Sequence, residues 1–117
     1  MRSPNFVYKV ATRTIYEASL AAGRFVGMPI DGRDGYIHLS AADQLAETLR
    51  LHFAGQSDLI LFALRTHDLG AGLRWEPSRG GQLFPHVYGE LPISAIARSA
   101  PIAVPPDGQV ALPEWVQ

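Results

Sequence analysis

The amino-acid sequence predicts a single α+β domain over residues 1–117. Segments typical of strands and helices alternate only in the first half of the chain, whereas the second half has mostly strand and loop patterns. This distribution favours antiparallel strands with segregated helices over a doubly wound parallel sheet. The sequence contains neither G-x-G-x-x-G nor G-x-x-x-x-G-K-[ST], so nothing supports a Rossmann or P-loop fold.

The first elements expected are a strand, a short helix and a loop. Residues 6–10 are rich in β-branched and aromatic side chains, which is typical of a strand. A helix is predicted over residues 14–22, with Thr14 as its N-cap, Glu17 at the capping-box position and Gly23 as its stop. Residues 27–35 contain three glycines, one proline and two aspartates, so this stretch is predicted to be a loop.

The middle of the chain contains the clearest helix and the clearest strand. Residues 36–39 predict a short buried strand, after which Ser40 is expected to cap a helix with Asp43 at the capping-box position. One face of this helix carries Leu45, Leu49, His52 and Phe53. Gly55 is expected to close the helix. The continuous apolar run over residues 58–65 predicts a central strand that is buried on both faces.

The second half is expected to add strands and loops. A short strand is predicted over residues 73–76, and the adjacent glycines within residues 78–82 indicate a loop. Residues 93–104 predict another strand, whose prolines place its far end at or beyond a sheet edge. Residues 112–116 are expected to pack Trp115 against the body of the domain.

Composition excludes several classes of function. Ten basic and eleven acidic residues give a net charge of −1, which offers no electrostatic signature for nucleic acid or for an anionic membrane. The absence of cysteine excludes disulfides, thiol catalysis and cysteine-ligated metal clusters. The longest apolar run, residues 59–64, is far shorter than the roughly 20 residues that span a bilayer, and no secretory signal is present. We therefore expect a cytoplasmic protein with a small-molecule ligand.

Two of the four histidines lie in segments that suit a site. His38 lies at the junction of the predicted strand and the predicted helix, where free helix N–H groups and Ser40 can hold an anion. The alternative is a buried strand histidine beside a serine that only caps the helix. His52 and His67 are interpreted as a packed helix residue and a solvated turn residue.

His86 follows Pro85, which fixes the backbone ahead of it. In an extended segment Tyr88 shares a face with His86, and this pair can bind a nucleoside-like ligand or transfer a proton near neutral pH. The alternative is a tight turn whose aromatic side chains close the core. Glu76 lies beside Trp75 and is expected to be partly buried, where it would orient an imidazole or act as a base.

The sequence resembles the domain-of-unknown-function 952 family, whose members are small bacterial and plant proteins. The resemblance extends from residues 7–10 to about residue 96 and depends on the motifs D-G-Y-I-H-L-S and F-P-H-V-Y-G. Its four segments are residues 34–40, 58–59, 75–76 and 84–89.

The family is distantly similar to the ADP-ribosyltransferase fold. This likeness implies split antiparallel sheets with two short helices that clasp NAD. On that analogy Lys9 stands near the first NAD-binding motif and residues 36–40 resemble the second. His86 stands where a transferase has its catalytic glutamate, and Glu76 and Glu90 are the candidates to replace that group.

Three functional hypotheses follow. The leading one is an enzyme, or an enzyme-derived domain, that acts on NAD or another nucleotide by glycosyl transfer, ADP-ribosyl transfer or hydrolysis. In it His86 is the acid/base, His38 and Ser40 hold phosphate or ribose, and Tyr36 or Tyr88 stacks on a ring. Because His86 stands where a transferase has its catalytic glutamate, a second hypothesis is a non-catalytic nucleotide sensor. The third is metal-assisted hydrolysis by His38, His86 and Glu76, although their long spacings favour a site without metal.

Overall fold

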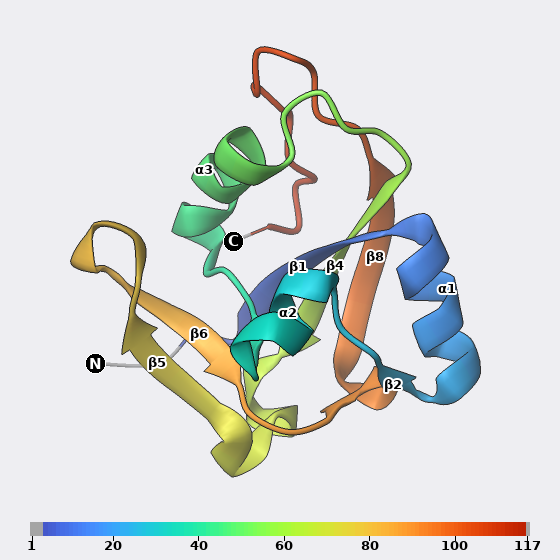
Figure 1. Ribbon diagram of the computed structural model, residues 1–117, viewed down its shortest axis with the longest axis vertical. Coiled ribbons are helices and arrows are strands. Elements are labelled where there is room, and N and C mark those ends of the chain that lie inside the picture. The colour runs from blue at the N-terminus through green and yellow to red at the C-terminus, as the bar shows by residue number, and fades with distance from the viewer. Residues whose placement is uncertain (1–3, 117) are drawn as a thin grey trace.

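The computed structural model describes residues 4–116, and its main sheet has three antiparallel strands (Figure 1). The strands are β1 (Phe6–Thr12), β4 (Leu59–Arg65) and β8 (Ile96–Ile102), in the order β1-β4-β8. β4 pairs along its length with both neighbours. The predicted strand over residues 58–65 therefore lies at the centre of this sheet.

A second sheet of three antiparallel strands positions the histidines. It consists of β3 (Ile37–His38), β6 (Leu83–Val87) and β5 (Leu73–Pro77), in the order β3-β6-β5. A small third sheet pairs β2 (Arg24–Phe25) with β7 (Leu91–Pro92). The prediction of a mixed domain with antiparallel sheets and few helices is confirmed.

Within residues 4–116, one backbone bridge, between Tyr8 and Ser40, joins the two larger sheets. Tyr8 N donates to Ser40 O at 2.8 Å, and Ser40 N donates to Tyr8 O at 2.9 Å. Leu39 N also donates to Pro85 O at 3.0 Å, which continues the contact between the β3 segment and β6. These bonds bring Lys9 of β1 next to the two histidine-bearing strands.

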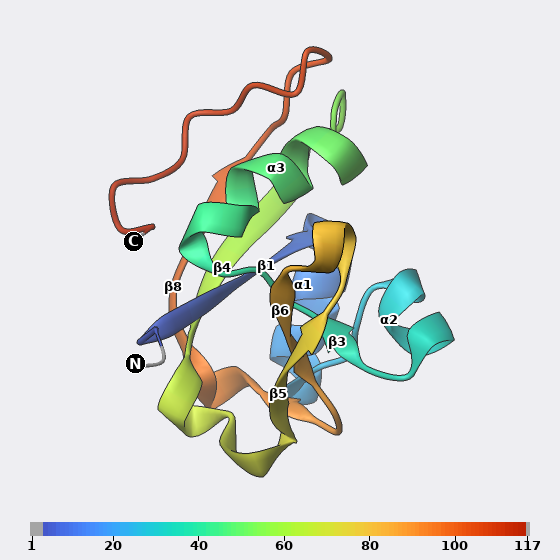
Figure 2. The same cartoon turned by 90° about the vertical axis from the view of Figure 1, so that its left-hand side faces the viewer.

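The alternating side chains of β4 divide the core into two apolar clusters. Phe62 is fully buried and contacts the rings of Tyr16 and Phe25, with centroid distances of 5.1 and 5.4 Å. Leu61, on the opposite face of the strand, is also fully buried and belongs to the cluster that contains Leu45 and Leu49. Helices α1 (Arg13–Ala22) and α3 (Ala42–His52) therefore cover opposite faces of the main sheet (Figure 2).

Two helix starts differ from the sequence prediction. Helix α1 begins at Arg13, because Thr12 and not Thr14 caps it by accepting a hydrogen bond from Ile15 N at 3.2 Å. Gly23 ends this helix as predicted, with φ of 80°.

Helix α3 follows Ala41, and Ser40 is not its cap because its backbone is paired with β1. The Gln44 side chain accepts from Ala41 N at 3.0 Å, so Gln44 and not Asp43 completes the cap. Helix α3 ends at His52, before Gly55.

A third helix, α2 (Pro29–Asp34), occupies the stretch predicted to be a loop. Pro29 stands at its first position, where a fixed φ favours a helix start, and Asp31 Oδ2 accepts a hydrogen bond from Met28 N at 2.7 Å. Gly35, with φ of 82°, ends it. The glycines of residues 27–35 thus lie before, within and at the end of a helix, and the expected number of two helices is wrong.

Short 3₁₀ turns and an extended C-terminal segment complete the fold. The Trp115 ring stacks near Tyr8 with a centroid distance of 6.4 Å, so the predicted packing of Trp115 is confirmed. None of the described helices is long and apolar enough to cross a membrane. The 3₁₀ turns are Thr66–Asp68, Gly70–Gly72, Arg79–Gly81 and Ile93–Ala95.

We predict that Phe62→Ala lowers the free energy of unfolding by about 3–5 kcal/mol, because it removes a buried ring that contacts two other aromatic side chains. Urea denaturation measures this change. As a control, Leu20→Ala alters a side chain that is 46% exposed and should change stability by no more than about 0.5 kcal/mol. Equal losses in the two variants would contradict the assignment of Phe62 to the core.

Candidate functional site

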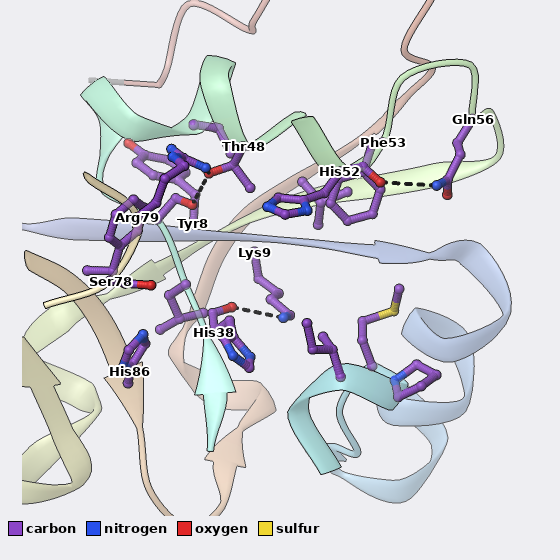
Figure 3. Close-up of a pocket in the computed structure, with 18 residues that line it drawn as sticks. Tyr8, Lys9, His38, Thr48, His52, Phe53, Gln56, Ser78, Arg79 and His86 are labelled. Carbon is purple, nitrogen blue, oxygen red and sulfur yellow. Dashed lines mark hydrogen bonds between the residues drawn. The ribbon is translucent and has the colours of Figure 1, made fainter. Parts of the chain in front are cut away.

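The structure places His38 and His86 side by side. They lie directly opposite each other in the β3–β6 pair, so their side chains share one face of the sheet. Their ring centroids are 5.6 Å apart. Both residues line one cavity, and Figure 3 shows them at its lower side. The two histidine-bearing segments thus form one site although 48 positions, 86 minus 38, separate them in the chain.

His86 is held by a carboxylate on the neighbouring strand β5. Its Nδ1 lies 2.7 Å from Glu76 Oε1, and Tyr88 Oη donates to the same oxygen at 2.8 Å. Both hydrogen bonds lower the pKa of Glu76 below its ordinary value, and the bond with His86 has the larger effect. The bond to Glu76 raises the pKa of Tyr88, so the phenol keeps its proton.

This pairing fixes which nitrogen of His86 carries a hydrogen. An ionised carboxylate only accepts hydrogen bonds, so His86 Nδ1 donates and Nε2 keeps its lone pair in the neutral ring. No residue among 4–116 bonds to Nε2, and Nε2 is not among the fully buried nitrogens without a partner, so this atom keeps some solvent access. His86 lines the cavity although its side chain is only 4% exposed.

Asp31 of helix α2 is the buried centre of a second network. Its carboxylate accepts from Lys9 Nζ at 3.0 Å, from His38 Nδ1 at 2.7 Å, from His38 N at 3.0 Å and from Met28 N at 2.7 Å. Burial by itself would raise the pKa of Asp31, but the hydrogen bonds from His38 and the charge of Lys9 outweigh it. The pKa of Asp31 is lowered to about 2.

Lys9 is buried on β1 and lines the cavity. Its ammonium group contacts Asp31 and donates to His38 O at 2.8 Å. Burial lowers the pKa of Lys9, and the charge of Asp31 opposes that shift. The residue that the family likeness places near NAD thus holds β1, α2 and β3 together.

His38 differs from His86 because both of its nitrogens face carboxylates. Nδ1 contacts Asp31, and Nε2 lies 2.9 Å from Asp34 Oδ2. Both bonds can form at once only when the ring carries two hydrogens, that is, as an imidazolium. In this arrangement both ring nitrogens of His38 are engaged by carboxylates, and neither is left free for a ligand.

Tyr36 and Tyr88 support the imidazoles from outside the cavity. The Tyr36 ring stacks on His86 with a centroid distance of 4.3 Å and also lies 4.7 Å from His38 and 5.2 Å from Tyr88. Neither tyrosine lines the cavity. The structure therefore places both rings where they orient the histidines and Glu76.

The cavity has a volume of about 400 Å³ and lies between β1, α2, α3 and the turn that joins β5 to β6 (Figure 3). Most of the surface exposed in it is apolar, and no carboxylate of the described chain takes part in it. Its polar lining residues are Lys9, His38, Ser40, Thr48, His52, Gln56, Ser78, Arg79 and His86. A largely apolar cavity with a few polar groups is the usual form of a small-molecule site.

Ser40 is buried in this lining and contacts Thr48. The two hydroxyl oxygens are 3.1 Å apart, and Thr48 donates its own hydrogen to Gln44 O at 3.1 Å. Ser40 must therefore be the donor to Thr48. Its hydroxyl hydrogen is engaged within the protein, and only its oxygen is left to accept a bond from a ligand.

A metal centre receives no support from this geometry. Across residues 4–116, no three histidine or acidic side chains are arranged to hold a metal ion. Glu76 and His86 bond directly to each other, and both nitrogens of His38 are occupied by aspartates. The three residues of the metal hypothesis are therefore near each other but do not point at a common centre.

Three residues of this site were given no role from the sequence: Asp31, Arg79 and Asp34, which was noted only as the first residue of the D-G-Y-I-H-L-S motif. The two aspartates lie in the stretch taken for a loop, where Pro29 followed by Asp31 is a signal of a helix start. That signal would have placed both aspartates on a short helix. Arg79 lies beside two glycines in a turn, and no local pattern distinguishes it from an ordinary surface arginine. Glu90, the other carboxylate considered, is exposed and lies 3.7 Å from Arg24.

The chain belongs to a protein family described as "Protein of unknown function (DUF952)", whose model matches residues 10–99. The predicted family membership is thereby confirmed. The chain is similar to protein CC0527 from Caulobacter crescentus, with 42% sequence identity. The crystal structure of CC0527 has a TM-score of 0.85 and the alignment covers 91% of this chain and 93% of that chain.

The solution NMR structure of CC0527 gives a TM-score of 0.79, with 92% of each chain covered and again 42% identity. No curated protein matches the chain. The comparisons therefore establish the family and the fold, and the ligand has to be inferred from the geometry of the site.

We predict that Asp31→Asn lowers the free energy of unfolding by about 3 kcal/mol near neutral pH, because it leaves the buried Lys9 without its counter-charge. The pKa of Asp31 is lower in the folded chain than in the unfolded one, so its stabilisation is present above about pH 4 and is lost as the pH falls toward about 2. Urea denaturation at several pH values should show that the difference in free energy of unfolding between wild type and Asp31→Asn shrinks over this range.

Asp34→Asn is the matched control, since Asp34 contacts the same imidazole from an exposed position. This substitution should lower the free energy of unfolding by no more than about 1 kcal/mol. If the difference in free energy of unfolding between wild type and Asp31→Asn stays constant from neutral to strongly acidic pH, the buried ion pair is ruled out.

Proposed function

We propose that this protein is an enzyme that acts on a nucleotide-like ligand, with His86 as its general base and NAD as the first compound to test. The observation that carries the proposal is the 2.7 Å bond between His86 Nδ1 and Glu76 Oε1, which leaves Nε2 without a protein partner on a residue that lines the cavity. A carboxylate that fixes the tautomer of a histidine and stabilises its imidazolium is a recurrent device of general-base catalysis.

In the proposed step, His86 Nε2 accepts a proton from water or from a hydroxyl group while the oxygen of that group forms a bond to the ligand. The electron pair of the broken bond leaves with the departing group, and Glu76 stabilises the imidazolium. For hydrolysis of NAD, the water oxygen bonds to the ribose carbon and nicotinamide leaves as a neutral molecule. The proton on His86 then passes to solvent.

The cavity suits part of such a ligand. About 400 Å³ is near the lower end of the range for ligand pockets, which is enough for one nucleoside-sized group but not for a whole dinucleotide. Its lining contains cationic groups and no carboxylate among the described residues, which favours an anionic ligand. The likeness of the family to ADP-ribosyltransferases supports NAD as the first compound, by analogy of fold alone.

A second candidate is a non-catalytic nucleotide sensor. One observation favours it: Glu76, the carboxylate bonded to His86, does not line the cavity and is engaged with His86 and Tyr88. Transfer of a glycosyl group usually depends on a carboxylate beside the sugar. Binding of nucleotides without turnover would support the sensor.

We predict that His86→Gln lowers kcat by about 10²–10⁴-fold, because it removes the proton acceptor. Glu76→Gln should lower kcat by a smaller factor with little change in KM, since Glu76 orients His86 and does not line the cavity. A thermal-shift screen of NAD, ATP, AMP and adenosine selects the ligand, because a compound that binds only the native state raises its melting temperature. Chromatography of products then measures turnover.

His67→Gln is the control, because its side chain is 81% exposed and pairs only with Asp68. It should leave turnover unchanged. Equal rates for wild type and His86→Gln would eliminate His86 as the base. Binding without any turnover would favour the sensor instead.

A test without ligand uses diethyl pyrocarbonate, which modifies an imidazole nitrogen that has a free lone pair. We predict that His86 is modified and that His38 is the slowest of the four histidines to react, because both of its nitrogens contact carboxylates. Peptide mass spectrometry over time measures each rate. Faster modification of His38 than of His86 would reverse the assigned roles. Asp34→Asn should accelerate modification of His38 alone.

A further inference from the structure

Arg79 lies at the rim of the cavity, in the turn between β5 and β6. Gly80 and Gly81 follow it with φ of 66° and 80°, a backbone that allows this tight turn beside α3. Figure 3 shows Arg79 at the side of the cavity nearest Thr48. The residue is partly buried and is one of the lining residues.

Two contacts hold the guanidinium group of Arg79 in place. It stacks on the Phe84 ring, with Cζ 4.9 Å from the ring centroid, and it donates to Thr48 Oγ1 at 3.4 Å. Thr48 gives its hydrogen to Gln44 O and accepts from Ser40 and Arg79, so it has no capacity left for a ligand. Thr48 thus positions Arg79, whose remaining N–H donors are available at the cavity rim.

The charge of Arg79 is not balanced by a neighbouring ion pair. The other strong cation of the lining, Lys9, is paired with Asp31. No carboxylate within residues 4–116 forms an ion pair with Arg79, and the acidic group that senses its charge, Glu47, is paired with Arg50. A ligand that enters the cavity therefore meets an oriented guanidinium group without a carboxylate partner, which suits bidentate binding of phosphate or carboxylate.

We infer that Arg79 is the anion-binding residue of this cavity. Its ligand is an amphipathic molecule with a phosphate or carboxylate group at Arg79 and a largely apolar or aromatic body. Phe84, Leu45 and Phe53 supply the apolar lining for that body, and the reacting atom lies toward His86. This inference deepens the proposed function and rests on it for the orientation of the ligand toward His86. It moves the anion away from Ser40, whose hydroxyl hydrogen is engaged by Thr48.

The test is a titration of ¹⁵N-labelled protein with inorganic phosphate and, separately, with acetate, at constant ionic strength. We expect saturable shifts of the Arg79 Nε–H signal and of the Ser78 and Gly80 amides in at least one titration. The two anions distinguish a phosphate site from a carboxylate site. A second comparison uses AMP and adenosine, and AMP should bind more tightly if phosphate is recognised.

Arg79→Gln should weaken the saturable binding by about tenfold or more, because a charged hydrogen-bonding group is lost. Arg79→Lys, which keeps the charge but loses the planar fork, should weaken it less. Arg74→Gln is the matched control: Arg74 lies on the same hairpin with its Cζ 5.0 Å from the Tyr88 ring centroid but does not line the cavity. It should leave the titration unchanged.

Shifts that do not saturate for either anion, or that persist in Arg79→Gln, would overturn the inference. His86→Gln separates it from the proposed function. Phosphate or acetate should still bind to this variant, so loss of turnover with retained anion binding supports both proposals. Retained turnover with retained anion binding would remove His86 as the base and leave the anion subsite intact.

Discussion

The buried carboxylate of Asp31 is the interaction on which the rest of the site depends. It joins three elements, because it contacts Lys9 on β1, the backbone and ring of His38 on β3, and the start of its own helix α2. A buried charge is costly unless it is paired and hydrogen-bonded, and this carboxylate satisfies both requirements. With Asp31 in place, Lys9 remains in the cavity wall and α2 closes one side of the cavity.

The two central histidines share one face of the same strand pair, yet their carboxylate partners give them different chemistry. Glu76 occupies one nitrogen of His86 and leaves the other with a lone pair. Asp31 and Asp34 occupy both nitrogens of His38 and leave neither free for a ligand. The site thus places a histidine with one nitrogen free of protein partners beside a histidine held by two carboxylates, with ring centroids 5.6 Å apart.

Much of the fold and of the candidate site could be predicted from the sequence. The apolar run of β4 predicted a strand buried on both faces, and the likeness to a family predicted which segments matter. The residues at which the helices begin were harder to predict from the sequence. Ser40 has the residue type of an N-cap, but its backbone pairs with Tyr8, a contact between segments 32 positions apart, 40 minus 8. The helix over residues 29–34 was missed because its glycines lie in the middle and at the end of a short segment that tertiary contacts stabilise.

The sequence by itself determined the class of fold, the family and the two histidine-bearing segments, because these depend on local patterns of side chains along the chain. Only the tertiary structure decided the contacts of each histidine, on which its proposed role is based. That role depends on which carboxylate lies within hydrogen-bonding distance of which ring nitrogen, and Glu76 and His86 are brought together by the register of β5 against β6. The same register places Arg79 at the cavity rim, where its charge is without a partner carboxylate among the described residues.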